Sequence, residues 1–229
     1  MAFFSANIQG LCPAKGKHKI NFLNEMALEE NIGLLIITET HLSEDHIDGE
    51  INMKGYSHYA VNRAANAKRG GVIVYIRDDL APGTKIVTSG SIGNIEFLVL
   101  YLKSLNITLV SIYRPPSSEF FHFDSVMNEV RLKIDEINMY MPKIIFSGDL
   151  NFPIINWDDL AVNGGTASDR RQAANMIGFF QDYFLEQYVK HPTRGNNILD
   201  LFATNEHELV SRIIIEDTKL SDHKFLIIN

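Results

Sequence analysis

The chain has one cysteine, Cys12, so no disulfide can form within it. Disulfides are concentrated in proteins of oxidising compartments, so the sequence favours a reducing one such as the cytosol or nucleus. It also lacks a basic and apolar leader, and no apolar run approaches the roughly 18 residues of a membrane-spanning helix. These absences predict a soluble protein with no membrane contact.

Positive charge is also scarce, with 21 Lys and Arg against 28 Asp and Glu and a formal net charge of -7. This balance argues against a protein that holds nucleic acid on a broad basic surface. Carboxylates that bind a divalent cation would account for some of the acidity and leave local basic patches for contacts. Charge therefore weakens a nucleic-acid interpretation without excluding it.

Several catalytic motifs are missing. There is no glycine-rich loop ending in Lys and Ser or Thr, and no Ser in a Gly-x-Ser-x-Gly frame, so phosphate loops and this type of nucleophile turn are excluded. The histidines show no paired spacing of the kind that a zinc-binding helix requires. Phosphate chemistry without a covalent nucleophile is the most economical interpretation.

The length and composition favour one domain. At 229 residues and 45% hydrophobic, the chain can bury a substantial core. No linker, repeat or low-complexity segment divides it, so we expect a single domain over residues 1–229, monomeric when isolated. The chain stops soon after an apolar segment at 225–228, and we expect the domain to be part of a larger polyprotein.

The hydrophobic pattern predicts alternating strands and helices. A strand around Phe3 is followed by a helix from Ile20, and further helices are expected at 123–137 and 169–185. Apolar runs predict strands at 34–38, 56–62, 71–76, 95–102, 107–113, 144–146, 198–203, 212–215 and 225–228. The strands between 56 and 113 are most simply an antiparallel meander. Strands without alternation need both faces covered, so we expect a four-layer α/β sandwich of two packed sheets flanked by helices.

Polar residues stand at the ends of these apolar runs. They are Asn7, Glu39, Tyr113, Asp149 and Asn151, and Ser221-Asp222-His223 completes the series. Polar groups at buried strand ends are costly unless they bind something. The sandwich would bring these ends to one rim, where a metal and a phosphate are the expected ligands.

Glu39 follows an apolar strand directly. Alone it would be a cap or turn residue, but beside other carboxylates it is a hard oxygen ligand suited to Mg²⁺. Asn7 alone is a turn residue, and its carbonyl becomes a candidate ligand only if Glu39 lies next to it. In Gly148-Asp149-Leu150-Asn151 the alternation sends Asp149 and Asn151 to the same side, although this pattern is also common in ordinary turns.

His223 is a candidate general base, and it then needs a carboxylate to orient its other nitrogen. Asp200, flanked by apolar residues, is the best candidate for that partner. Two alternatives remain: Asp200 pairs with Arg194 or a backbone amide, and Asp222-His223 is a simple surface turn.

Residues near the predicted rim are candidate DNA contacts, although most exposed Arg and Lys only solubilise. This set comprises Arg63, Arg69, Arg114, Arg170, Arg171, Thr193, Arg194 and Asn197, with Lys68 as a further cation.

Taken together, these motifs resemble the endonuclease/exonuclease/phosphatase superfamily, whose fold is DNase I-like. They are Asn7 to Leu11, Thr38-Glu39-Thr40, Arg69 to Val72, Tyr113-Arg114-Pro115-Pro116, Gly148 to Asn151, Leu199-Asp200-Leu201 and Ser221-Asp222-His223. They occur in the superfamily's order and span nearly the whole chain. Two stretches, Tyr113 to Pro116 and Thr193 to Leu201, are similar to the apurinic-endonuclease-type domain of non-LTR retrotransposons of the jockey-like lineages.

The resemblance implies that Glu39, with Asn7 and Asp222, holds Mg²⁺, or Mn²⁺ in its place, on the scissile phosphate. It implies that Asp149 and Asn151 orient or activate water, that Tyr113 contacts the phosphate, and that Asp200 supports His223. Which of Asp149 and His223 takes the proton stays open. The expected reaction is nicking of one strand of double-stranded DNA, leaving a 3′-hydroxyl for a reverse transcriptase that lies C-terminal on the same polyprotein. Action in the nucleus follows from that expectation.

Only six residues separate Thr193 from Asp200, which leaves little room for the long hairpin that some of these endonucleases insert into DNA. Target specificity would then be low or would reside at 64–69, at 158–170 or in other domains. An apurinic repair endonuclease is the nearest alternative, with Trp157 and Phe152 as candidate walls of a sugar pocket. A phosphatase of the superfamily ranks lower, and a non-catalytic binding module lower still because the motif set is intact.

Overall fold

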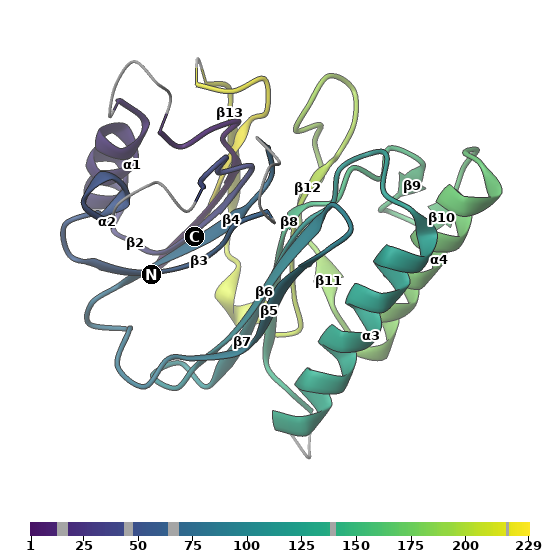
Figure 1. Ribbon diagram of the computed structural model, residues 1–229, viewed down its shortest axis with the longest axis horizontal. Helices are drawn as coiled ribbons and strands as arrows, with labels where there is room; N and C mark the ends of the chain where they lie inside the picture. Colours follow the sequence, from purple (N-terminus) through teal and green to yellow (C-terminus); the bar gives the residue numbers. More distant parts are fainter. Residues whose placement is uncertain (13–17, 44–47, 64–68, 138–140, 219) are drawn as a thin grey trace.

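The computed structural model describes residues 1–12, 18–43, 48–63, 69–137, 141–218 and 220–229. Its main body is two six-stranded sheets packed face to face, with two helices on the outer face of each (Figure 1). This is the predicted four-layer α/β sandwich. Both termini lie on the first sheet.

The first sheet has the order β13-β14-β1-β2-β4-β3. Its strands are β1 (Ala2–Asn7), β2 (Ile32–Thr38), β3 (Tyr56–Val61), β4 (Val72–Arg77), β13 (Ile213–Glu216) and β14 (Phe225–Ile228). β1 and β2 are parallel and joined through α1 (His18–Glu29), while every other pairing in this sheet is antiparallel. The parallel pair sends the ends of β1 and β2 to the same edge.

The second sheet has the order β11-β12-β8-β7-β6-β5. Its strands are β5 (Lys85–Ile92), β6 (Ile95–Leu102), β7 (Ile107–Tyr113), β8 (Ile144–Asp149), β11 (Glu186–Gln187) and β12 (Asp200–Thr204). β7 and β8 are parallel, and α3 (Phe120–Ile137) connects them. A separate two-stranded sheet pairs β9 (Ile155–Asn156) with β10 (Ala161–Val162).

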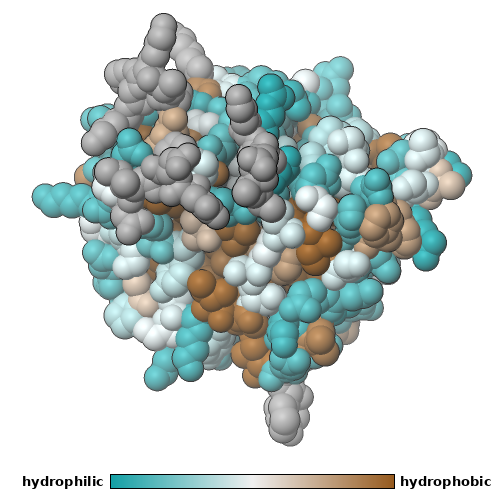
Figure 2. All heavy atoms as spheres, in the orientation of Figure 1, coloured by the Kyte–Doolittle hydropathy of each residue, from teal (hydrophilic) through white to brown (hydrophobic). Residues whose placement is uncertain are grey.

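Apolar side chains form three layers that explain this packing. The central layer fills the space between the sheets and includes Leu34, Ile36, Leu98, Ile145 and Phe202. α1 and the short α2 (Asp48–Ile51) cover the first sheet through Leu23 and Ile51. In the view of Figure 2, hydrophilic residues cover most of the described surface and apolar ones are confined to smaller patches.

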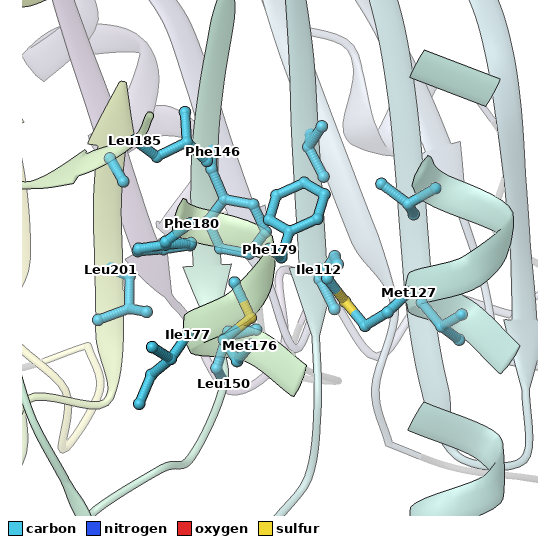
Figure 3. Close-up of a cluster of buried hydrophobic side chains, with 14 of the residues drawn as sticks. Ile112, Met127, Phe146, Leu150, Met176, Ile177, Phe179, Phe180, Leu185 and Leu201 are labelled. Atoms are coloured by element: carbon cyan, nitrogen blue, oxygen red, sulfur yellow. The ribbon is translucent and has the colours of Figure 1, made fainter. Parts of the chain in front are cut away.

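α3 and α4 (Ala167–Asp182) cover the second sheet. Figure 3 shows Phe179 and Phe180 of α4 beside Phe146 of β8, with Met127 of α3 near Ile112. α4 begins at Ala167 because Thr166 and Asp169 form a capping box. The helices expected from hydrophobic spacing at 123–137 and 169–185 are therefore present. Ile137 ends the first helix as expected, and the other three ends are shifted by two or three residues.

The expected antiparallel meander from 56 to 113 is wrong in part. β3 and β4 form a hairpin in the first sheet, whereas β5, β6 and β7 form a meander in the second. The turn from Asp78 to Thr84 carries the chain between sheets. β5 was not predicted because it is a half-exposed edge strand whose polar residues hide its apolar alternation.

Within the described residues, no helix is both long and apolar enough to cross a bilayer.

Gly148 marks the tightest approach between β7 and β8. A Cβ built there would lie 1.9 Å from the Ile112 carbonyl oxygen. Gly148→Ala should therefore lower the free energy of unfolding by about 2–3 kcal/mol or more, because rigid backbone must move. Urea denaturation followed by circular dichroism measures this change.

Gly49→Ala is the matched control, since Gly49 is exposed in α2 and no atom lies within 4 Å of the added Cβ. We expect it to be neutral or stabilising because Ala favours helices. Equal destabilisation by the two substitutions would contradict this account of the β7 and β8 contact.

Candidate active site

The site lies at the sheet edge where β1, β2, β7 and β8 end. Asn7 pairs with Thr38 in the register of β1 and β2, which brings Glu39 next to Asn7. Asp149, the last residue of β8, pairs directly with Asp200, the first of β12. The expected rim therefore forms because two parallel strand pairs, one in each sheet, end on the same side.

Asn7 connects the carboxylates of the two sheets. Its Nδ2 donates to Glu39 Oε1 at 2.9 Å and to Asp149 Oδ2 at 2.7 Å. Its Oδ1 accepts a hydrogen bond from the Gln9 amide at 3.2 Å. The positive end of this amide thus lies between two carboxylates, where a positive partner is favoured.

Glu39 lies in a ring of donors. Tyr113 Oη donates to its Oε1 at 2.8 Å, and His41 Nε2 donates to its Oε2 at 3.2 Å. Burial by itself would raise the pKa of Glu39, but hydrogen bonds from His41, Asn7 and Tyr113 outweigh it and lower the pKa to about 2. Glu39 is therefore an anion at all physiological pH values.

Asp149 is almost fully buried and lies at the centre of the site. Its Oδ1 accepts from the Asn151 amide at 3.1 Å, and Asn7 holds Oδ2. Burial and the neighbouring Asp200 carboxylate raise the pKa of Asp149 well above its usual range. Asp149 is thus far easier to protonate than an ordinary aspartate.

His223 is also buried, and Asp200 orients it. The Asp200 Oδ2 accepts from Nδ1 at 2.7 Å, which confirms the predicted contact over the two alternatives. Burial would lower the pKa of His223, but the bond and charge of Asp200, with the charge of Asp149, raise it overall. Among the residues that the structure describes, Nε2 has no hydrogen-bond partner; it lies 3.9 Å from Asp149 Oδ2 and 3.8 Å from Asp222 Oδ1.

This donor set fits a divalent cation and a phosphate. Glu39 and the Asn7 amide supply oxygen ligands of the kind that Mg²⁺ prefers, and the amide can present its oxygen by rotation. The buried Nε2 of His223 without a partner is a donor for an anionic oxygen. Asp149, Asp200 and His223 alone already form a group with metal-ligand spacing.

Asp222 is the member of the expected metal set that lies furthest toward solvent. Its side chain is 51% exposed, and Arg194 Nη2 donates to its Oδ2 at 2.6 Å. No direct bond joins it to Glu39 among the described residues. Asp222 thus lies near the His223 ring, and Arg194 binds one of the two carboxylate oxygens of Asp222.

Two expected DNA contacts are wrong. Arg114 is 1% exposed, and its guanidinium donates to Gln172 and to the carbonyls of Leu150 and Asn151. Thr193 is fully buried, and its Oγ1 accepts from the Leu199 and Asp200 amides at 3.1 Å each. Both side chains support the site from inside, because polar groups at this depth need internal partners.

The remaining candidates for DNA contact differ in availability. Arg63 is bound to the buried Glu96 and lies 5.6 Å from the ring centre of Tyr113. Arg69, Arg170, Arg171 and Asn197 are exposed, and Arg194 is half-buried. Lys68 and most of the proposed specificity segment 64–69 lie outside the described residues.

The turn between Thr193 and Asp200 is short, as expected. Arg194 and Asn197 bond to each other across it, and the Thr193 amide donates to the Asn197 carbonyl at 2.9 Å. A shallow cavity of about 150 Å³ lies beside it and is lined by Pro153, Trp157, Asn197 and Ile198, among others. Phe152, the other expected pocket wall, is buried in the core and does not line this cavity, and Trp157 is itself only 5% exposed and packs in the same core.

Sequence reasoning missed His41, which donates to Glu39, because its spacing suggested nothing. Its position two residues after Glu39 was the one available signal. Gln172 was also missed, since a buried Gln on an apolar helix face cannot be told from an exposed one by sequence.

A family model described as endonuclease-reverse transcriptase matches residues 107–227, which is more than half of the chain. The chain therefore belongs to the endonuclease-reverse transcriptase family, within the endonuclease/exonuclease/phosphatase superfamily, and is a hydrolytic phosphodiesterase. A comparison with curated proteins found no match.

Solved structures agree on the fold. The endonuclease domain of TRAS1, a telomere-specific non-LTR retrotransposon, is 17% identical with a TM-score of 0.65, covering 100% of this chain and 97% of that one. The AP endonuclease LMAP of Leishmania major is 14% identical with a TM-score of 0.67, covering 99% and 86%. The 3′-5′ exonuclease NExo of Neisseria meningitidis is 11% identical with a TM-score of 0.71, covering 100% and 99%.

Glu39 should dominate metal affinity. Glu39→Gln removes the negative charge but keeps the shape, so we expect Mn²⁺ binding measured by calorimetry to weaken at least tenfold. Glu30→Gln, on an exposed residue, is the control and should bind Mn²⁺ normally. Unchanged affinity in the Glu39 variant would remove Glu39 from the metal site.

The Thr193 hydroxyl should stabilise the turn before Asp200. Thr193→Val leaves two buried amides without an acceptor and should lower the free energy of unfolding by about 1–3 kcal/mol. Thr108→Val is the matched control, since the buried Thr108 hydroxyl has no hydrogen-bond partner among the residues described. Chemical denaturation compares the two, and equal effects would argue against the supporting role of Thr193.

Proposed function

We propose that this enzyme is a Mg²⁺-dependent endonuclease that nicks one strand of double-stranded DNA. The observation that supports it is the buried Nε2 of His223, which lacks a hydrogen-bond partner within the described part of the chain and which Asp200 orients beside Asp149, at the rim that also holds Glu39. Such an arrangement suits hydrolysis at phosphorus, where a donor must meet the charge that develops on oxygen. The family match and the likeness to DNA-cleaving enzymes support DNA as the substrate.

Glu39, Asn7 and Asp222 would hold Mg²⁺, or Mn²⁺ in its place, and the ion would neutralise charge on the scissile phosphate. Asp149 lies where it can accept a proton from the attacking water, and Asn151 fixes the Asp149 carboxylate through its backbone amide. His223 donates from Nε2 to a phosphoryl oxygen, with Asp200 accepting from Nδ1. Tyr113 lies against Glu39 and faces the same phosphate.

The reaction forms a bond from water oxygen to phosphorus and breaks the bond from phosphorus to O3′. The leaving oxygen takes a proton and becomes a 3′-hydroxyl, and the other product carries a 5′-phosphate. We propose that this hydroxyl primes a reverse transcriptase linked on the same polyprotein, as in non-LTR retrotransposons, and that the enzyme acts in the nucleus. Arg69, Arg170, Arg171, Arg194 and Asn197 remain the candidate DNA contacts.

One observation favours a second substrate, DNA with an abasic site. The cavity lined by Trp157 and Asn197 lies beside the short turn that precedes Asp200. An aromatic and amide lining suits an extrahelical sugar. A repair-type apurinic endonuclease is therefore the alternative function.

Supercoiled plasmid distinguishes these functions. We expect the protein with Mg²⁺ to nick intact plasmid, EDTA to abolish nicking, and His223→Ala or Asp149→Asn to slow it at least about 100-fold. His191→Ala, on an exposed histidine, should keep the full rate. Cleavage confined to plasmid with abasic sites would favour the repair enzyme, and cleavage of neither would reject both proposals.

A further inference from the structure

Arg114 is the largest polar side chain that the core buries completely. It directly follows Tyr113, the last residue of β7, and is 1% exposed. Among the described residues it forms no ion pair, and all of its hydrogen-bond acceptors are neutral. Burying a cation without a carboxylate partner costs free energy. A residue that bears this cost is therefore expected to have a specific structural role.

The partners of Arg114 belong to the loop that carries the catalytic groups. Its Nη1 donates to the Leu150 carbonyl at 2.9 Å and to the Asn151 carbonyl at 3.1 Å. Its backbone amide donates to the Asp149 carbonyl at 2.9 Å. One residue thus holds three successive carbonyl groups.

The contact is reciprocal. Asn151 Nδ2 donates to the Arg114 carbonyl at 2.9 Å, and Asn151 has a φ of 50°, a backbone conformation that non-glycine residues rarely adopt. Without the two bonds from Arg114, nothing among the described residues would hold the carbonyls of this strained turn. The orientation of Asp149 toward His223 depends on the same turn, since the Asn151 amide holds Asp149 Oδ1.

Two neighbours hold the guanidinium itself. Gln172 of α4 accepts from Nε at 2.9 Å, while its own Nε2 donates to the Ser118 carbonyl at 3.1 Å. The Phe152 ring lies against the guanidinium, with its centre 4.1 Å away. A planar guanidinium can donate in several directions and stack at once, whereas a lysine ammonium cannot.

We propose that Arg114 is a positioning residue: it fixes the backbone of Leu150 and Asn151 and thereby sets the aim of Asp149 and Asn151 at the scissile phosphate. The inference rests on the proposed roles of Asp149 and Asn151 in phosphodiester hydrolysis, but not on DNA being the substrate. Gln172 links α4 to this loop, because it accepts a hydrogen bond from Arg114 Nε.

Arg131 provides a matched control. It lies on α3, donates to the side chain and carbonyl of Asn175 on α4 at 2.9 and 3.1 Å, and stacks over Phe179 at 5.3 Å. Like Arg114, it donates to α4 and lies over an aromatic ring, but it is partly exposed, pairs with Asp182 at 3.5 Å, and makes no hydrogen bond to residues 149–151 among the described residues. Substitutions at Arg131 show what loss of such packing costs by itself.

The test compares Arg114→Met, Arg114→Lys, Gln172→Leu and Arg131→Met by steady-state hydrolysis of the p-nitrophenyl ester of thymidine 5′-phosphate and by urea denaturation. We expect Arg114→Met to lower kcat at least 100-fold with KM changed less than threefold, and Mn²⁺ affinity to stay within threefold. Arg114→Lys should recover no more than a tenth of the lost rate, because it restores charge without the planar fork. Arg131→Met should keep kcat within threefold.

Gln172→Leu leaves Arg114 in place but frees its Nε, and we expect a 5- to 20-fold loss of kcat. This variant decides the matter if Arg114→Met fails to fold. A folded Arg114→Met with kcat like that of Arg131→Met, or full recovery by lysine, would overturn the positioning role. Wild-type protein that hydrolyses the ester but fails to nick plasmid would reject DNA nicking alone.

Discussion

The Asn7 amide is the contact on which the site depends, because it binds carboxylates that belong to different sheets. Glu39 follows β2 in the first sheet and Asp149 ends β8 in the second, and Asn7 Nδ2 donates to both. Close by, the Oγ atoms of Ser147 and Ser5, one from each sheet, share a hydrogen bond at 2.7 Å, and Ser147 Oγ donates to the Leu201 carbonyl at 2.9 Å. These buried polar contacts leave one relative position of the sheets in which every partner is satisfied.

This arrangement concentrates negative charge, and the repulsion between the buried carboxylates destabilises the protein until a cation binds. Asp149 and Asp200 are both buried, and their proximity helps to raise the pKa of Asp149. Glu39 stays ionised because three donors surround it. A divalent cation would relieve this repulsion, so metal affinity and the instability of the carboxylate cluster have the same physical origin.

Buried residues behind the rim fix the backbone of the catalytic residues through specific hydrogen bonds. Thr193 holds the amides that lead into Asp200, and Arg114 holds the carbonyls that follow Asp149. Thr193 and Arg114 were expected to touch DNA. They are buried instead, and each stabilises the backbone next to one member of the Asp149 and Asp200 pair. Other side chains near the rim, such as Arg69, Arg171 and Asn197, are exposed. They are therefore available to contact a ligand.

From local features alone, the apolar runs and the helical spacing, the sequence predicted the sandwich and helices at 123–137 and 169–185. It also singled out the polar residues that end those runs as candidates for the site. It also predicted that Asp200 orients His223, because a buried aspartate requires a partner. The tertiary structure decided which sheet each strand joins, since the runs at β4 and β6 read alike but lie in different sheets. It also decided that Arg114 and Thr193 face inward and that His41 reaches Glu39, because burial and long-range contact depend on packing that no local pattern records.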